Sequence, residues 1–216
     1  SIRRQRQMCI RDRDLYESMK EETVNLSNVE AMDKIETKSD LFLIENPSVF
    51  QYLIDCLKDY VNGHKISKEF IRDRFPIIIC TSGCFRTAVL EYVRKYIERT
   101  PKCRIYFSGD FDRAGIEMME KLKDYFPQNV YPFQMDTRTY LYGLNGKCRE
   151  MSEKDREILS EKDSQLAKLM ALHGKKVYQE RIAANLWKVL LKEIQRVEMA
   201  MYQTQEEMER TNYQVR

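Results

Sequence analysis

The chain has 216 residues, of which 43% are hydrophobic and 33% charged, and its formal net charge is +3. This composition is typical of a globular protein with a sizeable core, and no apolar run approaches the roughly 18 residues needed to span a bilayer. The N-terminus lacks the apolar segment of a secretory signal, so we expect a cytoplasmic protein with no membrane partner. Six scattered Cys without CxxC spacing and only two His argue against a zinc ribbon or a Ser-His-Asp triad.

Positive charge is concentrated at the N-terminus. Residues 1–13 contain five Arg and one Asp, and residues 14–216 carry a net charge of −1. The main body is therefore not a basic nucleic-acid platform by composition. We interpret residues 1–13 either as an artefact resembling translated sequencing-adapter text or as a disordered basic arm that touches phosphates. Residues 14–40 are polar, show no core face and are interpreted as the remnant of an upstream region.

From Leu41 onward, short apolar runs alternate with amphipathic segments. This alternation implies right-handed βαβ crossovers and an α/β fold with a parallel sheet of about four strands, flanked by helices. The predicted elements are, in chain order, a strand at 41–45, a helix at 47–63, a short helix at 67–72, a strand at 76–80, a turn at 81–83, a helix at 87–98, a strand at 104–107, a helix at 114–125 and a strand from 130 to 133 or 135.

The last third of the chain is charged and predicted to be helical. Ser152 is a candidate helix N-cap and Gly174 is expected to break the helical run. A long helix is predicted from about Lys176, and its end, from Gln203 to Arg216, loses apolar periodicity and is expected to fray. We therefore divide the chain into an α/β domain at 41–145 and a helical C-terminal extension at 146–216.

Three acidic residues follow predicted strands. Glu45 closes the first strand, and Asp110 and Asp112 follow the third. Ligands of open α/β sheets bind outside the carboxyl ends of the strands, and carboxylates are suitable ligands for Mg²⁺ or Mn²⁺. Without a cation, three crowded acids would repel one another and their pKa values would rise. The alternatives are a helix-capping turn for the two Asp and a helix-dipole interaction for Glu45.

Several residues around these acids carry weaker signals. Gly109 would permit a tight turn, and Gly115 would permit close approach of two backbone segments. The turn after the second strand could cradle a phosphate, although it lacks the Lys-Ser/Thr pair of a Walker A loop. The residues interpreted as second-sphere or phosphate-contacting are Asn46, Ser82, Gly83, Arg113 and Asp136.

The order of these motifs resembles the Toprim domain of topoisomerases, bacterial primases and OLD-type nucleases. Residues 44–49, 80–83 and 109–115 are most similar to the Toprim-like C-terminal domain of the Wadjet-type defence nuclease subunit, itself similar to the topoisomerase VI A subunit. The similarity runs from about Leu41 to Leu144 and extends to residues 178–180. The chain departs from the family pattern in two places. After Ser82-Gly83 the family usually has a Gln and small residues, whereas this chain has Cys84-Phe85-Arg86. Relatives also have an upstream region that grips DNA, and residues 1–40 are too short to form it, so the chain is interpreted as truncated.

The resemblance implies a divalent-metal-dependent endonuclease. Glu45, Asp110 and Asp112 would hold one or two Mg²⁺ or Mn²⁺ ions and hydrolyse phosphodiester bonds of double-stranded DNA, with Glu45 as general acid/base. The implied partners are subunits of an SMC-type ATPase complex in anti-plasmid defence, and a homodimer is left open. A truncated chain would be inactive alone.

Two other functions remain open at this point. The first is a non-catalytic Toprim scaffold, whose acids bind only a structural ion while the chain recruits partners. The second is a phosphohydrolase of the haloacid dehalogenase kind, which also uses Asp-x-Asp. It is ranked lower, because that motif follows the first strand, whereas Asp110 follows the third predicted strand.

Overall fold

A four-stranded parallel sheet forms the centre of the molecule. The computed structural model describes residues 9–10, 22–23, 40–64, 66, 70, 74–83 and 85–214, with side chains from 40 to 204. The parallel strands are β3 (Leu41–Ile44), β4 (Ile77–Cys80), β5 (Ile105–Ser108) and β6 (Val130–Pro132), in the order β4-β3-β5-β6. The predicted α/β class is confirmed.

Two short strands near the N-terminus extend this sheet. β1 (Cys9–Ile10) pairs antiparallel with β4, and β2 (Glu22–Thr23) pairs antiparallel with β1. The complete sheet therefore has six strands, in the order β2-β1-β4-β3-β5-β6. The other residues of 1–39 and most of the short helix predicted at 67–72 lie outside the described residues, so the interpretations of residues 1–13 and 14–40 stay predictions.

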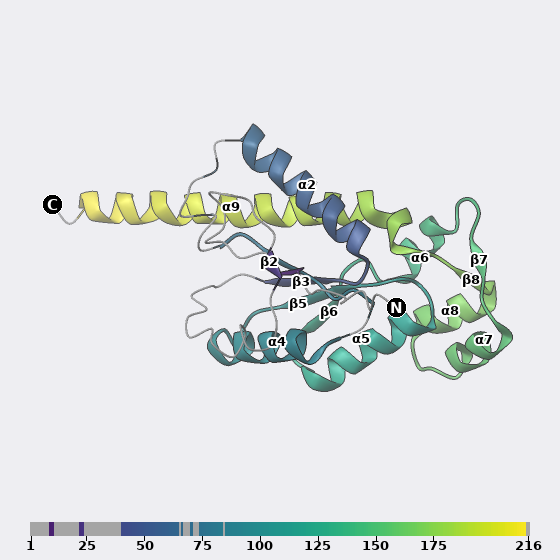
Figure 1. Ribbon diagram of the computed structural model, residues 1–216. Helices are drawn as coiled ribbons and strands as arrows, with labels where there is room; N and C mark the ends of the chain where they lie inside the picture. Colours follow the sequence, from purple (N-terminus) through teal and green to yellow (C-terminus); the bar gives the residue numbers. More distant parts are fainter. Residues whose placement is uncertain are drawn as a thin grey trace.

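Helices cover both faces of the sheet (Figure 1). α2 (Pro47–Gly63) and the long α9 (Ala183–Gln214) lie over one face, and α4 (Thr87–Arg99) and α5 (Arg113–Tyr125) lie over the other. The bounds of α2, α4 and α5 agree with the predicted ranges to within one residue. Within the described residues, no helix is both long and apolar enough to cross a membrane.

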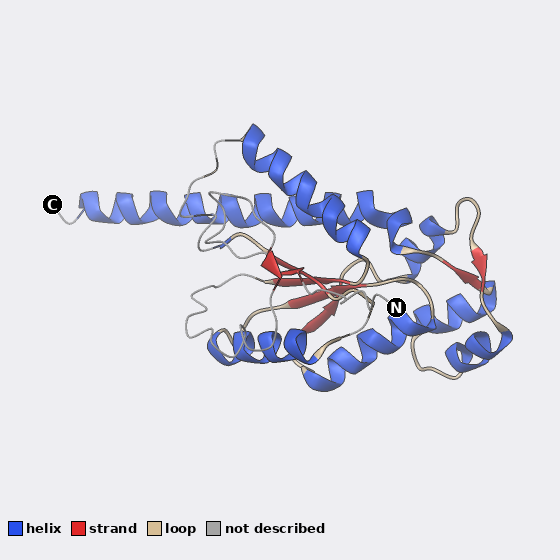
Figure 2. Cartoon of the chain, in the orientation of Figure 1, coloured by secondary structure: helices blue, strands red, loops and turns tan. Residues whose placement is uncertain are grey.

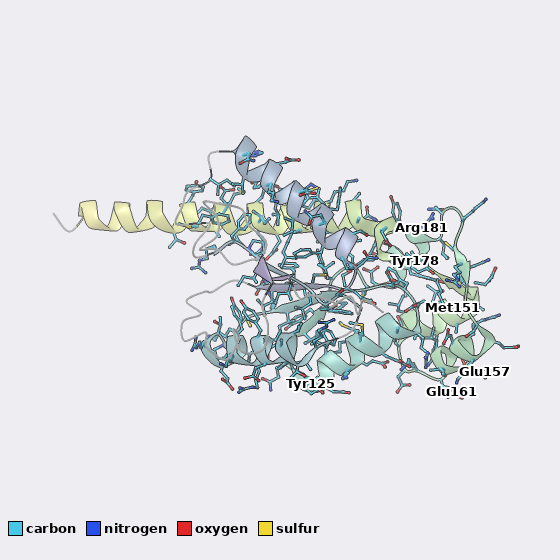
Figure 3. The ribbon with its side chains drawn as sticks, viewed as in Figure 1. Tyr125, Met151, Glu157, Glu161, Tyr178 and Arg181 are labelled. Atoms are coloured by element: carbon cyan, nitrogen blue, oxygen red, sulfur yellow. The ribbon has the colours of Figure 1, made fainter. Side chains whose placement is uncertain are left out.

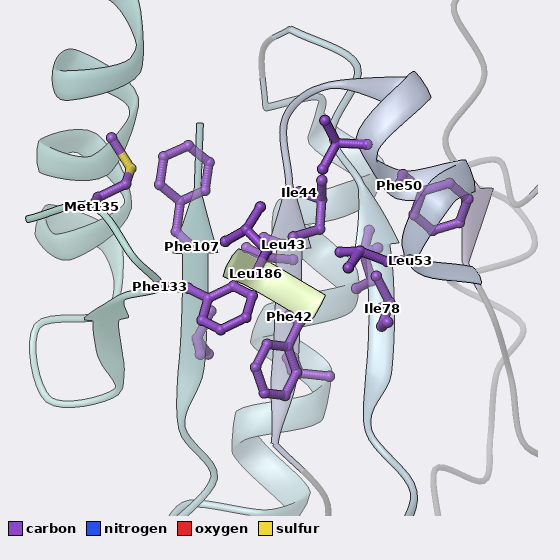
Figure 4. Packing of buried hydrophobic residues seen from close by; sticks show 14 of the residues in the cluster. Phe42, Leu43, Ile44, Phe50, Leu53, Ile78, Phe107, Phe133, Met135 and Leu186 are labelled. Atoms are coloured by element: carbon purple, nitrogen blue, oxygen red, sulfur yellow. The ribbon is translucent and has the colours of Figure 1, made fainter. Parts of the chain in front are cut away.

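The central strand β3 is buried on both faces, which explains its unbroken apolar sequence. Phe42, Leu43 and Ile44 are each at most 3% exposed. The Phe42 ring stacks on Tyr106 of β5 with ring centroids 4.9 Å apart, and Leu186 of α9 belongs to the same cluster (Figure 4). Packing against helices on both sides therefore fixes β3 in the middle of the sheet.

The connections of β3 and β5 leave the sheet in opposite directions. β3 leads through α2 to β4, whereas β5 leads through α5 to β6 on the other side. The two helices also lie on opposite faces (Figure 1). Because ligands of open α/β sheets bind where the strand order reverses, the carboxyl ends of β3 and β5 are the expected binding place.

The C-terminal part adds several short elements at one end of the sheet (Figure 2). They are α6 (Thr137–Gly143), β7 (Arg149–Glu150), α7 (Glu153–Ser160), α8 (Gln165–His173), β8 (Lys175–Lys176) and the 3₁₀ helix η2 (Gln179–Ile182). The predicted cap at Ser152 is confirmed, since its side chain accepts a hydrogen bond from the Asp155 N–H. The predicted break at Gly174 is also confirmed, because its φ of +62° ends α8 in the left-handed region.

The predicted long C-terminal helix is present, but its predicted start at about Lys176 is wrong. Lys175–Lys176 instead pairs with β7, and α9 begins only at Ala183. The backbone of Val177 exchanges hydrogen bonds with Phe111, so it cannot also join a helical ladder. At the other end the helix continues past Gln203 to Gln214. This segment has no apolar stripe, but it is rich in Gln, Glu, Met and Arg, which favour helices intrinsically.

Candidate functional site

Glu45 and Asp110 meet at the carboxyl ends of the neighbouring strands β3 and β5. Ile44 and Ser108 are register partners on adjacent parallel strands, so the residues that follow them begin at the same level. The Glu45 N–H donates to the Ser108 carbonyl over 3.0 Å, and the Asp110 N–H donates to Glu45 Oε2 over 3.0 Å. The two acids therefore lie together at the point where the strand order reverses.

Two glycines make this approach sterically feasible. A Cβ on Gly109 would come closer than 3.0 Å to Glu45 Oε2, and a Cβ on Gly115 would come closer than 3.0 Å to the Asp110 carbonyl oxygen. The close backbone approach predicted for Gly115 is confirmed. At Gly109 the reason is different, because the glycine leaves space for the Glu45 carboxylate.

Asp112 has the capping role that the sequence left as an alternative. Its Oδ1 accepts a hydrogen bond from the Gly115 N–H at 3.0 Å, at the start of α5. Its Oδ2 lies 3.5 Å from Lys176 Nζ, and the same ammonium lies 3.7 Å from Asp155 Oδ2. One oxygen of Asp112 thus caps a helix while the other faces a cation.

A segment from the C-terminal part crosses these strand ends. We call residues 177–180 the strap. The Gln179 N–H donates to Asp110 Oδ1 over 2.7 Å, the Asn46 N–H donates to Gln179 Oε1 over 2.9 Å, and Asn46 Nδ2 donates to Glu180 Oε1 over 2.7 Å. Tyr178 and Arg181, labelled in Figure 3, mark where the strap passes into η2, just before α9.

Sequence reasoning missed three residues that contact the site, Lys176, Gln179 and Glu180. The resemblance extended to residues 178–180 but assigned them no role. These residues are far from Glu45 and Asp110 along the chain, and no local pattern links them. One signal could have found two of them: Gln179 and Glu180 are an amide and an acid just before a long helix with an apolar stripe. That signal can be interpreted only after the helix has been placed on the sheet.

The five weaker candidates have structural roles or lie apart from the acid pair. Asn46 caps α2 by accepting from the Ser48 N–H, and Asp136 caps α6, a helix not predicted, by accepting from the Thr139 N–H. Arg113 pairs with Asp155 and Glu117. Ser82 and Gly83 form a left-handed turn, with φ of +53° and +93°, after β4, on the side of β3 away from β5.

The environment raises the pKa values of both paired acids. Removal from water is the main cause, and it raises the pKa of Glu45 from 4.5 to about 7 and that of Asp110 from 3.8 to about 6. Repulsion from neighbouring carboxylates adds to the rise, whereas the backbone N–H groups of Asp110 and Gln179 oppose it. A cation at this edge would relieve the same repulsion.

These shifts predict a stability that falls as the pH rises. A carboxyl group with a raised folded pKa stabilises the fold below its unfolded pKa, and that contribution is lost as the pH climbs through the folded value. Between about pH 4 and pH 7 the loss from Glu45 is on the order of 3 kcal/mol. We expect the melting temperature in EDTA to fall over this range, and less steeply for Glu45→Gln. An unchanged slope in that variant would contradict the assignment.

The type of donor in this site suits Mg²⁺ or Mn²⁺, but the side chains are not already gathered around one point. Glu45, Asp110 and Asp112 supply the hard oxygen atoms that these ions prefer. Among the residues that the structure describes, however, no three His, Cys, Asp or Glu side chains form a ready-made metal site. Ion binding would therefore require a carboxylate to exchange a present partner, such as Lys176 at Asp112, for the ion.

Together these features define an α/β protein with an acidic site at the strand-order reversal of a parallel sheet. Residues 22–190 match the family model described as "Protein of unknown function C-terminus (DUF2399)". The match covers more than half of the chain, and the protein belongs to this family. None of the curated proteins matches the chain.

Proposed function

We propose that the chain is the Toprim-like part of a metal-dependent DNA endonuclease subunit of the Wadjet type. The observation that carries the proposal is the contact between Glu45 and Asp110 at the strand-order reversal, with Asp112 two residues further on. The resemblance of residues 44–49, 80–83 and 109–115 to that subunit supports it. Wadjet-type subunits also carry domains of the family to which this chain belongs.

The three acids would have distinct roles in hydrolysis. Bound Mg²⁺ or Mn²⁺ would polarise the scissile phosphate and orient the attacking water. Glu45, whose pKa is raised to about 7 when no ion is bound, is the proposed general acid/base. The Gln179 N–H holds Asp110 in place, and Asp112 is fixed by its hydrogen bond to Gly115. Asp110 and Asp112 are the proposed ligands.

Double-stranded DNA and subunits of an SMC-type ATPase complex are the proposed partners, and a homodimer is compatible with the proposal. The net charge of residues 14–216 is −1, so this part of the chain has little overall attraction for DNA phosphates. We therefore assign most of the DNA affinity to the other components of the assembled complex.

A non-catalytic scaffold is the second candidate. It is favoured by one observation: each of the three acids already accepts a backbone hydrogen bond, Glu45 from Asp110, Asp110 from Gln179 and Asp112 from Gly115. In this alternative the acids would organise the strand ends or hold a structural ion, and the chain would contribute binding surfaces to a complex that cuts elsewhere.

Plasmid cleavage by the assembled complex distinguishes the two candidates. We expect Asp110→Ala to reduce the cleavage rate at least 100-fold, because the variant removes a carboxylate that positions the ion. Asp124→Ala is the matched control, since Asp124 is exposed on α5. Cleavage by Asp110→Ala at the wild-type rate would rule out this site as the nuclease centre and favour the scaffold.

A further inference from the structure

Gln179 connects the two strand ends that carry the acids. Its side chain is fully buried. Its backbone N–H donates to Asp110 Oδ1, in the loop after β5, and its Oε1 accepts from the Asn46 N–H, in the loop after β3. One residue thus holds both loops at fixed positions.

The other end of this side chain has no partner. Since Oε1 accepts from a backbone N–H, the orientation of the amide is determined, and Nε2 is the donor end. Nε2 is buried and makes no hydrogen bond within the described part of the chain. Leaving a buried donor without a partner is unfavourable, so such a group usually has a water or ligand partner.

Two more unpartnered groups lie at the same edge of the sheet. Among the described residues, the buried side-chain polar atoms without a partner are Gln179 Nε2, Thr81 Oγ1 and Ser108 Oγ. Thr81 directly follows β4, and Ser108 is the last residue of β5. All three residues therefore lie at the strand ends or on the strap that crosses them. Each group can donate a hydrogen bond, and Gln179 Nε2 belongs to the residue that contacts both acid-bearing loops.

We propose that Gln179 is a positioning residue of the acidic site, and that its free NH₂ group donates to an oxygen of a phosphodiester bound beside Glu45 and Asp110. This inference rests on the proposed function. An amide NH₂ cannot coordinate a metal ion, but it bonds readily to phosphate oxygens. The ammonium of Lys176 lies 3.5 Å from Asp112 Oδ2 and supplies positive charge two residues from Asp110.

Two variants separate the donor from the rest of the side chain. Gln179→Met removes the donor and the acceptor without adding charge, and it keeps the backbone N–H that holds Asp110. Gln179→Glu keeps an acceptor for Asn46 and places a negative charge where the donor was. The same two substitutions at Gln128 are matched controls. Gln128 is exposed and precedes β6, so it lies at the amino ends of the strands, away from the acids.

The probe is a thymidine dinucleotide, titrated into the 216-residue chain with Mg²⁺ and followed by the side-chain amide signals in ¹⁵N–¹H NMR spectra. The Gln179 signals, identified by their absence in Gln179→Met, are expected to shift saturably. A hydrogen bond to a charged group is worth about 1.5–3 kcal/mol, so Gln179→Met should weaken dinucleotide binding about 10- to 100-fold. Gln179→Glu should weaken it further, yet bind Mn²⁺ more tightly.

A purely structural role predicts a different result, namely lower melting temperatures with unchanged dinucleotide affinity. Wild-type affinity in both Gln179 variants, or effects equal to those at Gln128, overturns the inference. If either Gln179→Met or Gln179→Glu fails to fold, the dinucleotide affinity of the other variant tests the inference. A wild-type chain that binds Mn²⁺ but not the dinucleotide also overturns it, while leaving the metal site standing. A chain that binds neither overturns this inference and the metal site on which it rests.

Discussion

Replacing both Asp110 and Asp112 by Asn is expected to abolish saturable Mn²⁺ binding by this chain in a calorimetric titration. Asn keeps the size of the side chain, and its carbonyl oxygen still accepts the hydrogen bonds from Gln179 and Gly115. What the variant loses is two negative charges, on which the affinity for Mg²⁺ or Mn²⁺ depends. We expect at least a 100-fold weaker affinity with the fold retained.

The stability of this double variant is a second readout of the same prediction. Burial and repulsion raise the pKa of Asp110 to about 6, so its ionised form destabilises the fold at neutral pH. Asp110→Asn removes that charge, and the melting temperature in EDTA should therefore be maintained or raised. A large fall in melting temperature would mean that the loss of Mn²⁺ binding reflects unfolding. A maintained melting temperature would mean that it reflects the loss of the two charges.

Asp136→Asn is the matched control for the titration. Asp136 is also an N-cap, and it accepts a hydrogen bond from the Thr139 N–H at 2.8 Å. The same chemical change at Asp136 should leave Mn²⁺ binding intact. Equal binding by the wild type and the double variant would contradict the assignment of Asp110 and Asp112 as ligands, and no binding by the wild type would favour the scaffold.

Gly115→Ala is expected to destabilise the protein, although alanine normally favours helices over glycine. The added Cβ would come closer than 3.0 Å to the carbonyl oxygen of Asp110, which is backbone and cannot rotate away. Overpacking of this kind costs about 1–3 kcal/mol and shifts the surrounding backbone. The shift would act on Asp110 itself, so Mn²⁺ affinity should fall with the free energy of unfolding, measured by urea titration.

Gly63→Ala is the control for this variant. Gly63 ends α2, and nothing lies within 4 Å of the position of an added Cβ. The same substitution there should be neutral or stabilise the helix by up to about 1 kcal/mol. If Gly115→Ala unfolds at the same urea concentration as Gly63→Ala, the tight contact between α5 and Asp110 does not exist in solution.

Much of the sheet follows directly from local sequence. Residues 41–44 and 77–80 are unbroken apolar runs, and such runs form strands that are buried on both faces. Asn46 before Pro47 and Asp112 before α5 are capping signals that set the helix starts within a residue. Side-chain chemistry within a few residues decides these features, so they can be predicted without knowing the tertiary structure.

The sequence by itself thus determined the α/β class, the main strands and helices, and the presence of acids at two strand ends. Only the tertiary structure decided that β3 and β5 are neighbours, that Lys176 faces Asp112, and that Gln179 holds both Asp110 and Asn46. Gln179 and Asn46 are 133 residues apart. Contacts across such a distance depend on how α9 packs on the sheet, and the energy of that packing is spread over many buried side chains rather than carried by any local motif.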